Sequence, residues 1–127
     1  MHDHGVQAVK VYLDENRILH IEFGMSRRIT LDMIVEAHRQ HRAISTEKLP
    51  VIISADRLSR LDYDAQRMAS SPEVAANTLA TALMAHNFLH HHLIRIFTHY
   101  HRPPYPVRVF SDKQQALDWL QQLPRES

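Results

Sequence analysis

The sequence predicts an α/β domain that spans residues 1–127, with a mixed sheet of about five strands and about four helices. Three features support this prediction. Two alternating apolar and polar runs near the N-terminus suggest a β-hairpin. The apolar run Pro50–Ala55 is typical of a buried central strand. The chain then closes with a β-type run, Pro106–Phe110, and an amphipathic helix.

The composition excludes several classes of protein. With 15 Lys and Arg residues against 14 Asp and Glu residues, the net charge of +1 gives no general attraction to nucleic acid. The absence of cysteine excludes a disulfide scaffold and a thiol nucleophile. The two glycines, Gly5 and Gly24, are too far apart for a glycine-rich phosphate loop. We expect neither nucleic-acid binding nor a cofactor.

The sequence also lacks the features of a secreted or membrane-embedded chain. The polar N-terminal residues, MHDHGVQ, contain no apolar core of a signal peptide. No apolar run approaches the roughly 20 residues that a membrane helix needs. We therefore expect a cytoplasmic location and no integral membrane segment.

The predicted hairpin is followed by a helix with two apolar stripes. Residues 8–13 and 17–23 alternate as half-buried strands do, and the polar residues 14–16 form the turn. After a loop over 24–29, Thr30 can cap a helix that extends to about Ile44. One stripe of this helix consists of Leu31, Ile34, Val35 and His38, and the nearly opposite stripe consists of Met33, Ala37 and Ile44.

These two stripes suggest two different contacts for the helix. A helix of this kind often packs on a sheet and also contacts a second element. We expect Met33, Ala37 and Ile44 to lie away from the sheet and to form the interface of a homodimer. The alternative is that another helix or the N-terminal arm of the same chain covers this stripe.

The middle of the chain is partly ambiguous. A polar loop over 56–61 leads to Asp62, which can cap a helix that starts near Tyr63 and that Ser70, Ser71 and Pro72 end. In the alanine-rich stretch 73–85, propensity favours a helix, although Leu79–Ala85 would also serve as a buried strand. The run 88–101 has clear helical periodicity.

The last predicted helix has a recognisable beginning. Ser111 is a favourable N-cap residue, and Gln114 follows three positions later, as a capping box requires. The apolar residues then recur at helical spacing, at Ala116, Leu117, Leu120 and Leu123.

Three segments carry a resemblance to a known family. They are PVIISADRLSRLDYDAQRMAS, ATALMAHN with the amphipathic helix that follows it, and PVRVFSDKQQALDWL. The chain resembles STAS-type domains, the fold of bacterial anti-sigma-factor antagonists, and more closely the small bacterial STAS/Sec14-like proteins of unknown function. The resemblance implies that Leu79–Ala85 is a strand, which turns the chain after the hairpin into successive βαβ units.

One position departs from the antagonist pattern. The resemblance implies a phosphorylatable serine at the start of the helix after the central strand, and Asp64 stands at that position in this chain. A serine kinase cannot phosphorylate aspartate, which already places a negative charge at the helix N-terminus. We therefore expect no partner switching by phosphorylation, and Asp64 acts as a pseudo-phosphosite.

The 11 histidines and the serines give weak signals for chemistry. The pairs His38/His41 and His86/His90 could chelate from a helix, but neither shows the third ligand that zinc requires. Ser54 and Ser111 lack the flanking glycines of a nucleophile elbow. We expect no metal site, no catalytic residue and no enzymatic activity.

A ligand would most naturally bind at the carboxyl ends of the parallel strands, where α/β sheets bind their ligands. The polar residues that could line this rim are Arg28, Ser54, Asp56, Tyr63, His86, Asn87 and Ser111. They could orient a small polar ligand, but most of them could equally be helix caps and turn formers.

The sequence therefore predicts a non-catalytic interaction or regulatory module that forms a homodimer and has a possible regulatory protein partner. The alternative function is binding of a small molecule or lipid, as the Sec14 likeness allows. A closed and filled core would favour the first function. A sizeable pocket between helices and sheet, with polar groups at its mouth, would favour the second.

Overall fold

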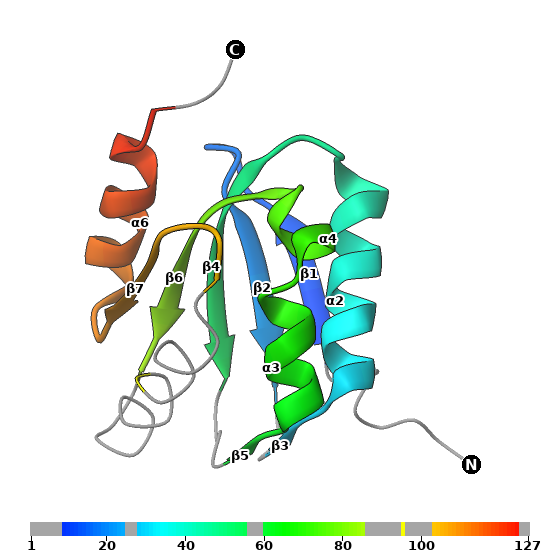
Figure 1. The fold of residues 1–127 in the computed structure, drawn as a ribbon. Helices are drawn as coiled ribbons and strands as arrows, with labels where there is room; N and C mark the ends of the chain where they lie inside the picture. Colours follow the sequence, from blue (N-terminus) through cyan, green and yellow to red (C-terminus); the bar gives the residue numbers. More distant parts are fainter. Residues whose placement is uncertain (1–8, 25–27, 56–59, 86–94, 96–102, 125–127) are drawn as a thin grey trace.

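The computed structural model describes residues 9–24, 28–55, 60–85, 95 and 103–124, and its centre is a five-stranded sheet (Figure 1). The strands, in their order across the sheet, are β1 (Val9–Leu13), β2 (Leu19–Phe23), β4 (Leu49–Ala55), β6 (Thr78–Met84) and β7 (Val107–Phe110). β1 is antiparallel to β2, and all other neighbours are parallel. The predicted mixed sheet with an N-terminal hairpin is confirmed. A separate parallel pair is formed by β3 (Arg28–Ile29) and β5 (Arg60–Leu61), within segments that the sequence predicted as loops.

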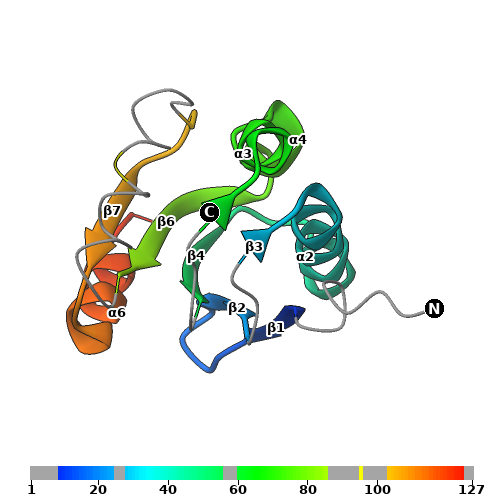
Figure 2. The same cartoon turned by 90° about the horizontal axis from the view of Figure 1, so that it is seen from below.

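The described helices cover the two faces of the sheet unequally. They are α2 (Leu31–Ile44), α3 (Tyr63–Ala69), α4 (Pro72–Ala75) and α6 (Lys113–Gln122). Figure 2 shows α2, α3 and α4 on one face and α6 on the other. Because β2, β4 and β6 follow one another in the same direction across the sheet, right-handed crossovers place their connecting helices on one face. The predicted helix 88–101 lies outside the described residues.

The strict alternation of the strands produces two apolar clusters. On the α2 face, residues of β2 and β4 such as Ile21, Phe23 and Val51 pack against Met33 and Ala37. On the opposite face, Ile52 and the alanines of β6 pack against α6, and the buried residues of this cluster are Ile18, Ile52, Ala80, Ala82, Met84, Phe110, Ala116 and Leu120. The sheet is therefore buried on both faces where β4 and β6 cross the molecule.

The orientation of α2 contradicts the sequence-based prediction. Met33 is 0% exposed and Ala37 is 4% exposed, because both side chains lie in the core under the helix, whereas Val35 is 45% exposed. The interpretation of Met33 and Ala37 as residues of a free interface stripe is therefore wrong. Both stripes are apolar, so the sequence could not show which of them faces the core. Contacts of α2 with both β1 and α3 leave Ile34 and His38 half-buried on the flank of the helix.

Other boundaries are close to the prediction, with one correction. Leu79–Ala85 was predicted as a strand, and β6 occupies Thr78–Met84. Thr30 caps α2 as predicted, accepting a hydrogen bond from the Met33 N–H at 3.4 Å. The N-cap of α6 is Asp112 and not Ser111, because β7 continues to Phe110 and Ser111 forms a bend before the helix. Within the described residues, no helix combines the length and apolar character needed to cross a bilayer.

Candidate functional site

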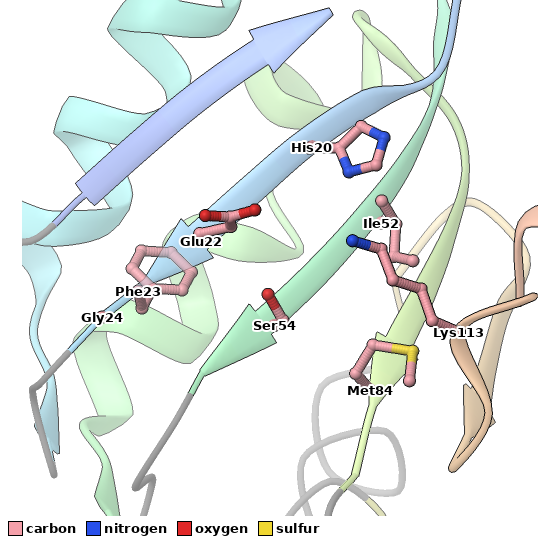
Figure 3. A pocket seen from close by; sticks show the side chains of 8 residues that line it. All are labelled: His20, Glu22, Phe23, Gly24, Ile52, Ser54, Met84 and Lys113. Atoms are coloured by element: carbon pink, nitrogen blue, oxygen red, sulfur yellow. The ribbon is translucent and has the colours of Figure 1, made fainter. Parts of the chain in front are cut away.

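A groove on the α6 face of the sheet brings charged and apolar side chains together at the carboxyl ends of the parallel strands (Figure 3). Its volume is about 320 Å³, which is at the lower end of the range for small-molecule sites. The described residues that line it are His20, Glu22, Phe23, Gly24, Ile52, Ser54, Met84 and Lys113. We call it the Glu22–Lys113 groove.

The groove exists because α6 covers only part of its face of the sheet. Helix α6 packs over β4, β6 and β7. The part of this face outside the main contacts of α6, on β1 and β2, carries polar side chains, since Tyr12 lies opposite His20 and Lys10 lies opposite Glu22 in the antiparallel register. The β2–β4 register then places Ser54 beside Glu22. The groove runs between this polar strip and the start of α6.

His20 is fixed at one end of the groove by a network in the hairpin. It is 5% exposed, and its Nε2–H donates to Asp14 Oδ2 at 2.8 Å. The Tyr12 ring stacks on the imidazole at 4.6 Å and an interplanar angle of 12°. Burial alone would raise the pKa of Asp14, but hydrogen bonds from His20 and from backbone N–H groups outweigh it and lower that pKa below its ordinary value. Asp14 therefore stays ionised and holds one imidazole nitrogen.

Two opposite charges face the groove from different elements. Glu22 projects from β2, and its Oε2 accepts a hydrogen bond from the Tyr12 hydroxyl at 3.1 Å. Burial and this hydrogen bond raise the pKa of Tyr12, so the phenol remains a donor. Figure 3 shows the Lys113 side chain reaching from the first residue of α6 towards β4, with Ser54 nearby. Across the residues that the structure describes, no ion pair joins Glu22 to Lys113.

The structure separates the predicted rim residues. Ser54 lines the Glu22–Lys113 groove. Arg28 and Tyr63 lie instead at the β3–β5 pair and the start of α3, and Ser111 is exposed between β7 and α6. The other three predicted residues, Asp56, His86 and Asn87, lie outside the described part of the chain.

The start of α3 forms a second polar feature. Asp62 is the N-cap residue as predicted, but its carboxylate binds Arg28 rather than a helix N–H group. The contact is bidentate, with Arg28 Nε at 2.8 Å from Oδ1 and Nη2 at 2.8 Å from Oδ2. Beside this pair, the Tyr63 side chain is 67% exposed and Asp64 lies exposed in the first turn.

The sequence interpretation did not identify three polar residues of the groove: His20, Glu22 and Lys113. The alternation of 17–23 did place His20 and Glu22 on one face of their strand, and this was the only available signal. Their proximity to Ser54 depends on the β2–β4 register, and Lys113 joins them only through the docking of α6.

The groove also contains a serine and a histidine, the residue types of a nucleophile and its base. Ser54 and His20 line the same groove, but within the described residues no hydrogen bond joins them, and His20 Nε2 is held by Asp14. A serine nucleophile needs such a contact with its base. In the described part of the chain, no three side chains of the metal-binding types come together.

Comparison with known proteins shows the family and the fold. A family model described as a domain of unknown function, DUF7793, matches residues 11–124. None of the curated proteins matches the sequence. The structure is similar to that of an uncharacterized protein of the DUF3478 family with a SpoIIAA-like fold from Shewanella loihica PV-4. The TM-score is 0.59 at 18% identity, over 89% of this chain and 92% of the other. This likeness shows the fold alone and confirms the STAS-type resemblance.

Proposed function

We propose that this chain, which belongs to the DUF7793 family of domains of unknown function, is a non-catalytic STAS-like module that binds a small polar ligand in the Glu22–Lys113 groove. The observation that carries the proposal is the groove itself, a space of about 320 Å³ with Glu22, Ser54 and Lys113 around an apolar floor. Such a combination of apolar walls with a few convergent polar groups is typical of small-molecule sites.

The position of the groove supports the same proposal. It lies at the carboxyl ends of β2, β4 and β6, where α/β sheets bind ligands. Its polar side chains come from rigid elements, with Glu22 on β2, Ser54 on β4 and Lys113 at the start of α6. Because these elements are held by the two packed faces of the sheet, the groove is largely formed before a ligand arrives.

A screen of small polar metabolites by thermal denaturation tests this function. A ligand present at about 100 times its Kd stabilises the folded state by about 2.7 kcal/mol and raises the Tm by several degrees. We expect at least one such shift in the wild type and its loss in Ser54→Trp, because the indole would fill the groove. Gln121→Trp, at an exposed position near the other end of α6, is the matched control. A screen without shifts, or shifts unchanged in Ser54→Trp, would contradict the proposal.

The exposed Tyr63 supports a second function, binding of a regulatory protein at the start of α3. Exposed tyrosines are frequent anchors of interfaces, and the Arg28–Asp62 pair fixes the backbone beside this one. The fixed charge of Asp64 makes this surface independent of a serine kinase. Incubation with serine kinases of the same cell, followed by mass spectrometry, should find no phosphate on residues 62–66. Stoichiometric phosphate there would overturn the role given to Asp64.

A further inference from the structure

We infer that the ligand of the Glu22–Lys113 groove is a zwitterion of amino-acid size, with its amine at Glu22 and its carboxylate at Lys113. The inference rests on the proposed function and adds the chemical class of the ligand to it. The juxtaposition that carries it is a carboxylate on β2 and an ammonium on α6, which line the same groove from different walls.

The two charges are available to a ligand. Among the described residues, Glu22 receives one hydrogen bond, from the Tyr12 hydroxyl to Oε2, which orients the carboxylate and leaves Oε1 to accept from a ligand donor. Tyr12 is itself held by its stacking on His20, so the carboxylate has a fixed direction. The Lys113 ammonium provides donors on the opposite side, and Ser54 lies between them with a hydroxyl that can donate or accept.

These charges discriminate between ligand classes. A ligand with a single charge, or with none, would displace water from both protein charges but pair with only one of them or with neither. The Glu22 carboxylate is half-buried, so leaving it without a partner is costly, whereas a charge-assisted hydrogen bond at each end is favourable. A ligand that carries both signs is the one class that pairs both Glu22 and Lys113.

The rest of the lining limits the size and polarity of the ligand. The floor between the charges consists of Ile52 and Met84. These apolar side chains match an apolar substituent on the ligand. A groove of about 320 Å³ accommodates a single amino acid, and a large cofactor would not fit in it.

Calorimetric titration with matched ligands tests the inference. The probes are L-leucine, L-methionine and L-phenylalanine, each beside the amine that lacks its carboxylate and the acid that lacks its amine. For at least one of the three sets, we expect the zwitterion to bind at least about 10-fold more tightly than either single-charge analogue. Lys113→Met should remove the advantage over the amine, and Glu22→Gln should remove the advantage over the acid. Lys48→Met and Glu47→Gln, which lie near the opposite end of β4, are the matched controls and should bind like the wild type.

The outcomes separate the ligand class from the proposed function. If in every set a single-charge analogue binds as tightly as its zwitterion, or if either variant weakens the zwitterion, the amine and the acid of a set equally, the ligand class is wrong and the groove remains a binding site. If none of the amino acids binds but another metabolite shifts the Tm in a manner that Ser54→Trp abolishes, again only the class is wrong. If neither the amino acids nor the metabolite screen gives binding, both proposals are wrong.

Discussion

His41 is a polar side chain enclosed by the apolar cluster under α2. It is 3% exposed, and its Nε2 has no hydrogen-bond partner among the described residues. A small cavity of about 50 Å³ lies beside it, between α2 and the sheet, with Tyr105 and Thr81 also in its lining. Burial, together with the smaller effect of the neighbouring His38, lowers the pKa of His41 to about 4. The imidazole is therefore neutral in the folded protein at ordinary pH.

This burial predicts acid-sensitive stability. Above pH 6.5, the ordinary pKa, His41 is neutral in both the folded and unfolded states and has no effect. As the pH falls from 6.5 towards 4, the unfolded chain takes up a proton that the folded chain excludes, so the free energy of unfolding falls, by about 3 kcal/mol in total. Urea unfolding across this range should show the loss in the wild type and a smaller one in His41→Leu. Ala43→Leu adds the same side chain at an exposed position of α2 and should keep the wild-type slope. Equal slopes in all three proteins would contradict the role of His41.

At the scale of one element, mutations can test which face of α2 lies against the core. Met33→Ala removes a fully buried side chain and should lower the free energy of unfolding by about 2–5 kcal/mol, measured by chemical denaturation. Val35→Ala, two residues away but exposed, should change it by less than about 0.5 kcal/mol. By the same reasoning, Ala37→Arg should unfold the domain, since it places a charge in the core. If Val35→Ala lowered the free energy of unfolding more than Met33→Ala did, α2 would have the orientation that was expected from the sequence.

The start of α6 gives a second test at this scale. The Asp112 carboxylate accepts a hydrogen bond from the Gln115 N–H at 3.2 Å, whereas the preceding Ser111 is exposed and lies outside the helix. Asp112→Ala should therefore cost about 1 kcal/mol of stability. Ser111→Ala should cost only a few tenths, because surface changes away from such contacts are nearly neutral. Thermal denaturation of the two variants compares them directly, and a larger loss in Ser111→Ala would show that the cap is assigned to the wrong residue.

At the scale of the whole molecule, the homodimer remains a prediction, although the apolar stripe on α2 no longer supports it. Met33 and Ala37 are core residues and cannot form an interface, and of the three candidates only Ile44, 39% exposed, retains appreciable accessible surface. Light scattering at micromolar concentration measures the mass directly. A homodimer has twice the 14.8 kDa of one chain, and Ile44→Arg should then halve the measured mass. A mass of one chain in the wild type would contradict the prediction.

Much of the fold could be predicted because its signals are local. Alternation over 8–13 and 17–23 is enough to indicate a hairpin, and Thr30 is enough to begin α2. The strand β6 could not be predicted from propensity, because its alanines and leucines suit a helix equally well and only the resemblance to a family resolved them. The groove could not be predicted from the sequence for another reason. Glu22, Ser54 and Lys113 become neighbours only through strand register and helix docking, which are properties of the assembled sheet.

The strand order has a consequence for biosynthesis. Each strand of the main sheet pairs with the main-sheet strand that precedes it in the chain, so the sheet order β1-β2-β4-β6-β7 follows the order in which a ribosome delivers the strands. The nascent sheet can therefore grow one strand at a time from its first hairpin, with no strand inserted between two earlier ones. Helix α6 emerges after all five strands, and until then the face that carries Ile52 and Ala82 lacks the helix that covers it in the finished protein. We therefore expect a nascent chain that still lacks α6 to expose this apolar cluster and to be prone to aggregation.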